Sequence, residues 1–179
     1  MPRRQALIDH LRTHSLRTDG PFRLASGAMA DWYMDARQTT FSGRGSVLVA
    51  QAVLEVLDSE AEAVGGMTMG ADPIAVATAT HSEGRLDAFS IRKADKDHGT
   101  GGRLVGPVRP GRKVAVLEDT TTTGRAFLEA VKVAETSGLV VVQAISLFDR
   151  SGGTVESLMA SRSLPYVALV LPADLGVRA

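Results

Sequence analysis

The sequence predicts an α/β fold: a central parallel sheet flanked by helices, with a small N-terminal hood. Amphipathic helical patterns alternate with buried-strand patterns along the chain, which favours parallel strands with helices on both faces. With 179 residues, 44% of them apolar, the chain is long enough for one globular domain. We expect a single domain over 1–179, with the hood at about 1–40 and the core at about 41–179. Short apolar runs typical of buried strands occur near 63–67, 87–91, 113–117, 140–148 and 166–171.

The intervening segments carry helix signals. Asp72 followed by Pro73 is suited to be a cap and first-turn pair, so a helix should begin there. Gly138 is suited to the position just after a helix end, because glycine adopts the left-handed conformation freely. We therefore expect helices at about 3–16, 46–57, 72–80 and 125–137.

Two segments depart from the alternation. Near the N-terminus, 21–24 and 32–35 look like two strands joined by Ser26 and Gly27, and we expect them to form the hood over the sheet edge. Residues 94–112 lie between two strands but contain little apolar sequence. A connection this long without structure is usually a functional lid or a disordered segment.

Composition excludes several classes of protein. The formal net charge is zero, so nothing in the overall charge favours binding to nucleic acid or a membrane. The chain has no cysteine, which excludes disulfides and thiolate metal sites and suits a reducing compartment. No apolar run approaches the roughly 20 residues that span a bilayer, and the N-terminus lacks the apolar stretch of a signal peptide. We expect a cytoplasmic enzyme, and we expect His10, His14 and His81, which lack metal-ligand spacing, to have no site role.

The segment KVAVLEDTTTTG, residues 113–124, is the most informative part of the sequence. A short apolar strand is followed by Glu118 and Asp119, at the strand end where open α/β sheets bind ligands. Thr120–Gly124 then supplies hydroxyls and consecutive backbone N–H groups before a helix, which is typical of an anion-binding nest. Acids for sugar hydroxyls and a nest for a phosphate indicate a site for a phosphorylated ribose. The structural alternative is a helix cap with two surface acids.

Neither of the common nucleotide motifs is present. No lysine follows Gly124, so a triphosphate P-loop is excluded, and no G-x-G-x-x-G follows a strand. Instead, the segment resembles V-x-V-x-E/D-D-x-x-x-T-G, the phosphoribosyl diphosphate (PRPP) signature of type I phosphoribosyltransferases. The resemblance implies that family's fold, with the two acids on the ribose hydroxyls and the loop on the 5-phosphate. The PRPP-binding residues it implies here are Glu118, Asp119, Thr120, Thr121, Thr122, Thr123, Gly124, Arg125 and Ala126.

A second motif, R-K-x-x-K-D-H-G-x-G-G at 92–102, resembles the mobile loop of orotate phosphoribosyltransferases. Arg92, Lys93, Lys96 and His98 match positions at which that family contacts PRPP and pyrophosphate. The resemblance implies that Lys96 and His98 are catalytic together with Asp119, and that the loop reaches the partner's site in a homodimer with shared active sites. A charged loop that is merely solvated is the alternative.

The same resemblance predicts the base pocket. Arg150 follows the expected strand at 140–148 and matches the family's orotate-binding arginine, while Thr122 matches the other orotate contact. A planar guanidinium can meet the orotate carboxylate with two hydrogen bonds. From the sequence alone, a surface arginine at a strand end is an equal alternative. We expect 22–27 and 33–37 to cover the base, and Trp32 to pack in the core or hood and not to act as a stacking platform.

The resemblance, over about 22–150, implies transfer of the phosphoribosyl group from PRPP to orotate. It implies Mg²⁺ as cofactor, held by pyrophosphate and ribose oxygens with no direct protein ligand. Many family members have lysine where this chain has Ala25, and another lysine in the turn at Thr68-Met69-Gly70. Arg23 or Arg37 could replace these cations.

Two other functions remain open at this stage. A purine phosphoribosyltransferase would share the 118–124 motif but would not need Arg150 to bind a carboxylate. A PRPP-sensing regulator that binds nucleic acid and has lost catalysis is the other alternative. The zero net charge and the basic loop argue against the regulator.

Overall fold

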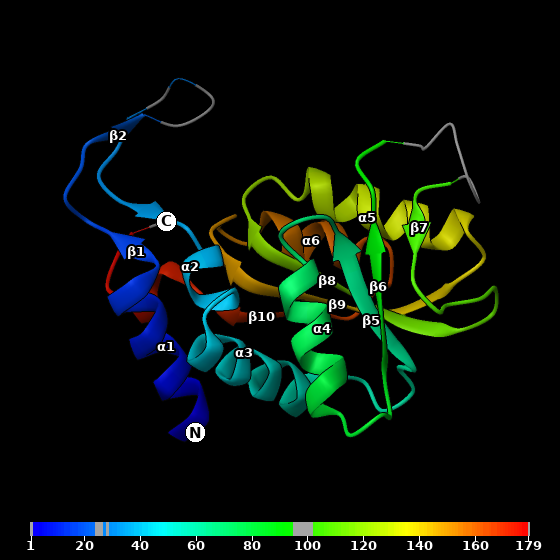
Figure 1. Cartoon of the computed structure of the whole chain (residues 1–179). Helices are drawn as coiled ribbons and strands as arrows, with labels where there is room; N and C mark the ends of the chain where they lie inside the picture. Colours follow the sequence, from blue (N-terminus) through cyan, green and yellow to red (C-terminus); the bar gives the residue numbers. More distant parts are fainter. Residues whose placement is uncertain (1, 24–26, 28, 95–101, 179) are drawn as a thin grey trace.

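The computed structural model describes residues 2–23, 27, 29–94 and 102–178, and its centre is a six-stranded mixed sheet (Figure 1). Five strands are parallel, and β7 runs antiparallel to β6 at one edge. The predicted α/β fold with helices on both faces is confirmed, but the sheet is not wholly parallel. In spatial order the strands are β10 (Tyr166–Val170), β9 (Val140–Asp149), β8 (Lys113–Thr121), β5 (Ala63–Met67), β6 (Asp87–Ile91) and β7 (Leu104–Val105).

The edge strand β7 corrects one prediction. It lies inside 94–112, which the sequence analysis expected to lack structure, and it pairs with Ser90 and Ile91. The Arg92 N–H donates to the Arg103 carbonyl at 2.8 Å and extends this pairing toward the loop. Two residues are too short for a hydrophobic pattern to be recognised, which is why the sequence did not predict the strand. The predicted basic residues at 95–101 lie outside the described part of the chain.

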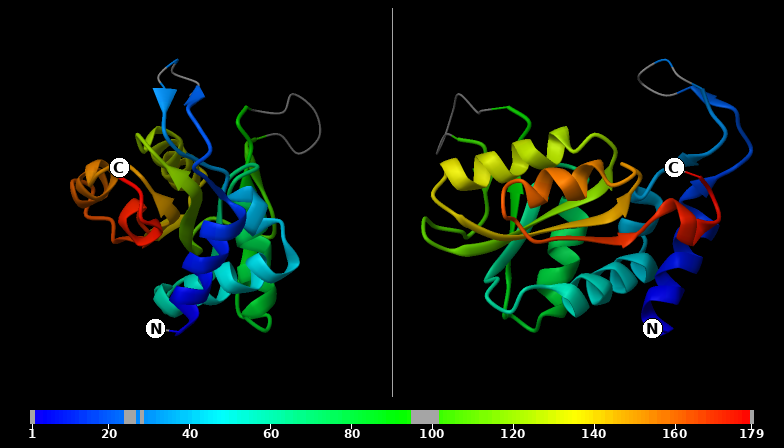
Figure 2. Two further views of the ribbon diagram at one scale, coloured as in Figure 1. Left: turned by 90° about the vertical axis from the view of Figure 1, so that its left-hand side faces the viewer. Right: turned by 180° about the vertical axis from the view of Figure 1, so that it is seen from behind.

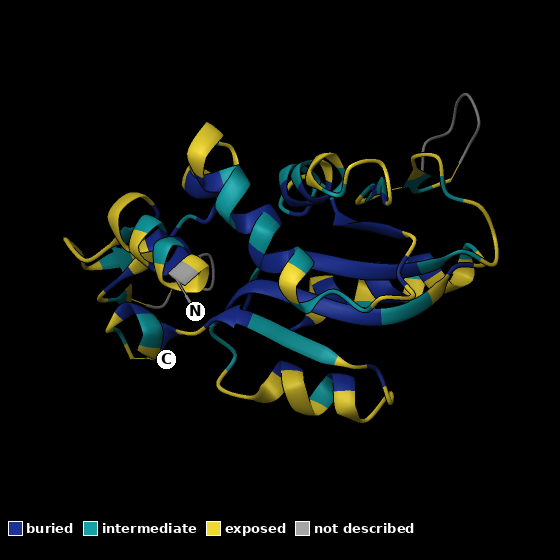
Figure 3. Cartoon of the chain, turned by 90° about the horizontal axis from the view of Figure 1, so that it is seen from below, coloured by how far each residue is buried: buried dark blue, intermediate teal, exposed yellow. Residues whose placement is uncertain are grey.

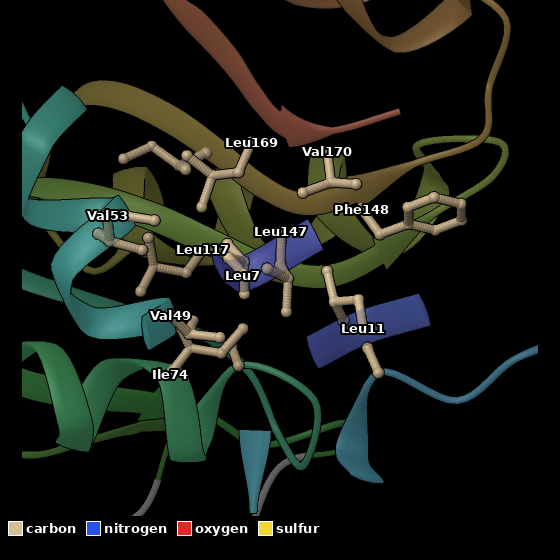
Figure 4. Close-up of a cluster of buried hydrophobic side chains, with 14 of the residues drawn as sticks. Leu7, Leu11, Val49, Val53, Ile74, Leu117, Leu147, Phe148, Leu169 and Val170 are labelled. Carbon is tan, nitrogen blue, oxygen red and sulfur yellow. The ribbon is translucent and has the colours of Figure 1, made fainter. Parts of the chain in front are cut away.

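Helices cover both faces of the sheet (Figures 1 and 2). Strand β8 supplies both cores because its side chains alternate: Ala115 and Leu117 join one buried cluster, and Val114 and Val116 join the other. Figure 4 shows the first cluster, in which Leu117 lies among side chains from three helices and two further strands. Its helices are α1 (Pro2–His14), α3 (Gly43–Val56) and α4 (Asp72–His81); the opposite face carries α5 (Arg125–Thr136) and α6 (Thr154–Ala160).

The helix boundaries confirm some predictions and correct others. Helix α5 ends as expected before Gly138, which has a φ of +83°. The predicted cap at Asp72 is wrong, because Ala71 is the N-cap and Asp72 is the first helical residue. Its carboxylate instead accepts a hydrogen bond from the Thr68 hydroxyl at 2.6 Å. The short helices α2 (Arg37–Thr40) and α6 and the 3₁₀ helix η1 (Pro172–Leu175) were not predicted.

The hood differs in its pairing from the prediction. Segments 21–24 and 32–35 do not pair with each other. Instead β2 (Phe22–Arg23) pairs with β3 (Met29–Ala30), and β1 (Leu16–Arg17) pairs with β4 (Tyr33–Met34), all antiparallel. The chain leaves the ribbon at Trp32, whose buried side chain packs on the core residue Phe148. Helix α1, which the prediction counted with the hood, packs into the core through Leu7 and Leu11 (Figure 4).

The order of the strands defines where a ligand can bind. From β5 the chain continues to its neighbour β6 on one side, and from β8 it continues to β9 and β10 on the other. Neighbouring strands whose connections diverge open a crevice at their carboxyl ends, where open α/β sheets bind ligands. Buried strands lie between partly exposed helices in Figure 3, so this crevice is at the edge of a close-packed core. None of the helices in the described ranges is long and apolar enough to span a membrane.

Candidate active site

Strand β8 carries the acid pair into the crevice. The sequence analysis expected the strand to end at residue 117, but it continues through Glu118 and Asp119 to Thr121. Glu118 is buried, with 8% of its surface exposed, and its Oε2 has no hydrogen-bond partner among the described residues. Asp119 is half-buried and accepts a hydrogen bond from the Thr120 N–H at 2.7 Å. The pair therefore contains one buried oxygen that a ligand hydroxyl could satisfy.

The position of Glu118 changes its titration. Burial, followed by the charge and hydrogen bonding of neighbouring Asp119, raises the pKa of Glu118 to about 8. The positive charge of Lys93 acts in the opposite direction on the pKa of Glu118. Lys93, at the start of the basic loop, thus acts electrostatically on Glu118.

The threonine segment forms the predicted cradle at the start of α5. Gly124 is the N-cap, with a φ of +73°, and has no side chain to cap the helix; a long 3.5 Å hydrogen bond joins the Arg125 N–H to the Thr123 hydroxyl. Uncapped N–H groups and the helix dipole together favour an anion there. The cradle encloses a cavity of about 210 Å³ lined by Glu118, Thr120, Thr121, Thr122, Thr123, Gly124, Arg125, Ala126 and Phe127.

One threonine of the cradle is used inside the fold. The Thr121 side chain is buried, and its hydroxyl is 2.6 Å from the Ser146 hydroxyl. Thr122 and Thr123 are exposed. Thr121 therefore fixes the cradle to β9, while its neighbours present their hydroxyls to solvent.

The turn after β5 approaches the acid pair from the neighbouring strand. A Cβ placed on Gly70 would lie 2.6 Å from Asp119 Oδ1 and 2.7 Å from its Cγ. Only glycine fits this position without moving the carboxylate. The turn at Thr68–Gly70, where many family members have lysine, therefore has a steric role in this chain: it forms one wall around Asp119.

The base of the basic loop is fixed to the sheet and to α5. Arg103 donates to the Arg92 carbonyl at 2.7 Å and forms a 2.6 Å ion pair with Glu129 on α5. Arg103, the next cation along the chain after the loop motif, is thus used in internal contacts. Lys96 and His98 lie outside the described residues, so their predicted roles stay predictions.

Arg150 lies next to the cradle. In the register between β8 and β9, Thr121 is opposite Asp149, and the Arg150 N–H donates to the Thr121 carbonyl at 2.9 Å. The two predicted orotate contacts, Thr122 and Arg150, therefore follow directly after paired residues of adjacent strands. Burial lowers the pKa of the Arg150 guanidinium. In the described part of the chain this guanidinium has no ion pair or side-chain hydrogen bond, as an anion receptor requires.

Trp32 contributes to the site in a way the sequence did not reveal. It is buried, as predicted, but the expectation that its ring is no stacking platform is wrong, because Arg150 Cζ lies 4.2 Å from the ring centroid in cation–π contact. The cavity beside this pair, about 520 Å³, is lined by Thr18, Met29, Ala30, Asp31, Trp32, Arg150, Val177 and Arg178. Residues 118 positions apart in the sequence leave no local pattern, so only the structure could reveal this contact.

Arg23 and Arg37, the two arginines that could replace the family's missing lysines, differ in their contacts. Arg23 is exposed on β2. Arg37 is held by Asp35, which accepts from Arg37 Nε at 2.7 Å and from its backbone N–H at 3.2 Å. Burial opposes ionisation of Asp35, but the hydrogen bonds from Arg37 and Gln38 outweigh it and keep the pKa of Asp35 below its ordinary value. The hydrogen bond and charge of Asp35 raise the pKa of Arg37, and Asp119 adds a smaller contribution.

Fold and site together define a type I phosphoribosyltransferase. The fold is shared with an adenine phosphoribosyltransferase from Leishmania donovani, at a TM-score of 0.67 and 14% identity, over 94% of this chain and 81% of that one. A scan against models of protein families gave no match.

Closer relatives define the family. An orotate phosphoribosyltransferase from Streptomyces avermitilis is 42% identical over 167 residues, which are 91% of this chain and 91% of the relative. The structure of Mycobacterium tuberculosis orotate phosphoribosyltransferase in complex with Fe(III) dicitrate has a TM-score of 0.87 and 38% identity, over 98% of this chain and all of that one. The PRPP complex of that enzyme matches at a TM-score of 0.83 and 34% identity, over 98% and 100%. The chain belongs to the orotate phosphoribosyltransferase family.

The buried acid predicts a pH-dependent stability. Because the pKa of Glu118 rises from 4.5 to about 8 on folding, the unfolded chain binds fewer protons between these values. The free energy of unfolding of the ligand-free protein should therefore fall as pH rises from about 5 to about 8. Urea unfolding across this range, with Glu118→Gln as the matched variant, measures the effect. We expect the decline to be much smaller in Glu118→Gln, and equal slopes for the two proteins would contradict the assignment.

The wall around Asp119 predicts a steric effect. In Gly70→Ala the new Cβ would displace the Asp119 carboxylate, so KM for PRPP should rise roughly ten-fold or more, as misplaced binding groups cause. Gly43→Ala is the matched control, because a Cβ there meets nothing within 4 Å. Steady-state kinetics with thermal unfolding of both variants provides the test. Unchanged PRPP kinetics in Gly70→Ala would refute the role of this turn.

Proposed function

We propose that this enzyme transfers the phosphoribosyl group of PRPP to orotate, giving orotidine 5′-phosphate and pyrophosphate, a step in the synthesis of UMP. One observation carries the proposal: the acid pair on β8, the uncapped start of α5 and the Arg150 guanidinium converge at one end of the sheet. These groups suit ribose hydroxyls, a phosphate and a carboxylate respectively. The names of the relatives, and the PRPP bound by the M. tuberculosis enzyme, support the same substrates.

The proposed chemistry needs no side-chain nucleophile. The ribosyl C1 passes through an oxocarbenium-like state as pyrophosphate leaves, so catalysis rests on positioning and on stabilisation of separating charge. Glu118 and Asp119 accept hydrogen bonds from the two ribose hydroxyls, and the unpartnered Glu118 Oε2 is a ready acceptor. The N–H groups of Thr120–Gly124 and the hydroxyls of this segment other than that of Thr121, with Arg125 and Ala126, bind the 5-phosphate.

The basic loop supplies positive charge at the leaving group. We infer that Lys96 and His98 stabilise the charge that develops on pyrophosphate, with Arg92 and Lys93 supporting them at the base of the loop. The ion pair of Arg103 with Glu129 supports this assignment, because it anchors the loop where it leaves the sheet. Lys93 also interacts electrostatically with Glu118, which suits a cation that meets PRPP.

Mg²⁺ is the proposed cofactor. The donor groups suit a hard cation, because the acid pair and the threonines offer only oxygen ligands. Among the described residues, no three acidic or histidine side chains are arranged to hold a metal ion, so pyrophosphate and ribose oxygens would supply most ligands. When bound, Mg²⁺ neutralises charge on the leaving pyrophosphate. Glu118 and Asp119 would orient the ribose through its hydroxyls.

The base pocket lies between Arg150 and the hood. In the proposal Arg150 binds the orotate carboxylate through two hydrogen bonds, and Thr122 contributes a hydroxyl. A half-buried guanidinium without a carboxylate partner among the described residues supports this assignment. Hypoxanthine and adenine have no carboxylate to pair with it.

We also infer a homodimer with shared active sites, from the resemblance of the basic loop. The cytoplasm is the proposed location, which the absence of cysteine suits.

Substrate identity has a direct test. With PRPP and Mg²⁺ the protein should consume orotate and release pyrophosphate, whereas hypoxanthine and adenine should not react, because they lack the carboxylate that Arg150 would bind. Arg150→Ala should raise KM for orotate roughly a hundred-fold, as loss of a bidentate charged pair does. Turnover of a purine without reaction of orotate would overturn the proposal.

The shared site predicts complementation between inactive variants. Lys96→Ala removes a loop cation, and Asp119→Asn removes an acid of the ribose site. If the loop serves the partner's site, a mixed dimer contains one site with both defects and one with neither. With random exchange about half of the dimers are mixed, and each mixed dimer has one intact site out of two. Activity should therefore return to about a quarter of the wild-type value, as follows from two-fold symmetry.

Mass spectrometry of the mixture verifies that the subunits have exchanged. Each variant kept alone is the control for residual activity. If the loop closes over its own subunit, every site retains one defect. Activity that stays at the level of the separate variants after verified exchange would therefore refute sharing while leaving the chemistry intact.

A further inference from the structure

Trp32 is held by two contacts from two distant parts of the chain. It is the sole tryptophan, it lies just before β4, and 8% of its surface is exposed. Its indole N–H donates to the Arg178 carbonyl at 3.0 Å. Its ring meets Phe148 edge to face, with centroids 6.0 Å apart and an interplanar angle of 83°. Hydrogen bonding and aromatic packing together leave this ring a single orientation.

The remaining face of the ring carries Arg150. The guanidinium carbon lies 4.2 Å from the ring centroid, while the Arg150 backbone is held by the Thr121 carbonyl. A guanidinium held over a ring by cation–π contact uses none of its N–H donors in that contact, whereas a salt bridge would occupy some of them. No carboxylate in the described ranges forms such a bridge with Arg150.

The contact with Trp32 therefore lowers the entropic cost of binding an anion at Arg150. A long arginine side chain beside an open cavity samples many rotamers, and binding an anion would have to restrict them at a cost in affinity. The fixed indole surface restricts the guanidinium before the anion arrives. Both residues line the same cavity of about 520 Å³, so the oriented donors are at the surface that a ligand would occupy.

We propose that Trp32 is a positioning residue for recognition of the orotate carboxylate: its ring orients the Arg150 guanidinium, and the Arg178 carbonyl fixes the ring. This inference rests on the proposed function. The C-terminal segment is thereby part of the base site, although it is far from the sequence motifs. Val177, which also lines the cavity, packs against the core and donates its N–H to the Pro172 carbonyl at 3.1 Å, so the segment has a firm support.

A double-mutant cycle tests the coupling. Trp32→Leu should raise KM for orotate about ten-fold, as loss of a partly buried cation–π contact implies, with little change in kcat or in KM for PRPP. Trp32→Phe is the conservative variant: it keeps a ring face but loses the indole donor, and it should recover most of the affinity. In an Arg150→Ala background, Trp32→Leu should have almost no further effect on KM for orotate.

The outcomes separate the possible failures. If Trp32→Leu raises KM equally in both backgrounds, Trp32 acts on packing alone and the inference is wrong. If Arg150→Ala itself leaves the orotate kinetics unchanged, the proposed role of Arg150 in binding orotate is wrong, and the inference about Trp32 is wrong with it. Thermal unfolding of each variant shows whether it folds.

The wild-type protein offers a second measurement that needs no folded variant. Because Trp32 is the only tryptophan, all tryptophan fluorescence of the protein comes from the ring that contacts Arg150. Orotidine 5′-phosphate and uridine 5′-phosphate differ by the carboxylate, and calorimetry shows when each is bound. We expect orotidine 5′-phosphate to change the emission of Trp32 and bound uridine 5′-phosphate to change it much less. Equal changes, or no change with orotidine 5′-phosphate, would overturn the inference.

Discussion

The burial of Glu118 beside Asp119 is the constraint on which the site depends. A buried carboxyl with an unpartnered oxygen and an acidic neighbour destabilises the ionised form of the fold. The fold tolerates this position because β8 is a central strand between β5 and β9. The packing of the two buried apolar clusters on its faces offsets the free-energy cost of burying the Glu118 carboxyl. A ribose hydroxyl would satisfy the free oxygen, so the groups that destabilise the ligand-free protein are those that favour the bound one.

Three different physical devices bind three parts of the proposed substrates. The phosphate cradle uses the backbone and the exposed start of α5, which needs no lysine. The ribose site uses side-chain acids held by strand geometry and by the close turn at Gly70. The base site uses a cation oriented by an aromatic ring. The acids and the cradle belong to β8 and the turn that follows it, and Arg150 follows the neighbouring strand β9, so the pairing of these two strands brings the three groups to one end of the sheet.

The sequence could predict what is encoded locally. Strand β8, the acids and the cradle form one contiguous segment, so their chemistry and their place at a strand end were evident before the structure. The pairing of β2 with β3 and the edge strand β7 were missed, because two-residue strands carry no periodicity. The contact of Gly70 with Asp119 and that of Trp32 with Arg150 join distant positions, and only the tertiary fold determines them.

The distribution of cations shows how a neutral chain could bind a highly charged substrate. Where many family members have lysine this chain has Ala25, and the turn after β5 has Met69, which is exposed. The negative charge of Asp119 contributes to raising the pKa of Arg37, but the ion pair with Asp35 already offsets part of the positive charge of Arg37. Arg103 is likewise paired, with Glu129. In the proposed function the charge of PRPP therefore falls to the cradle's N–H groups, to Mg²⁺ and to the cations of the basic loop, of which Lys93 acts electrostatically on Glu118.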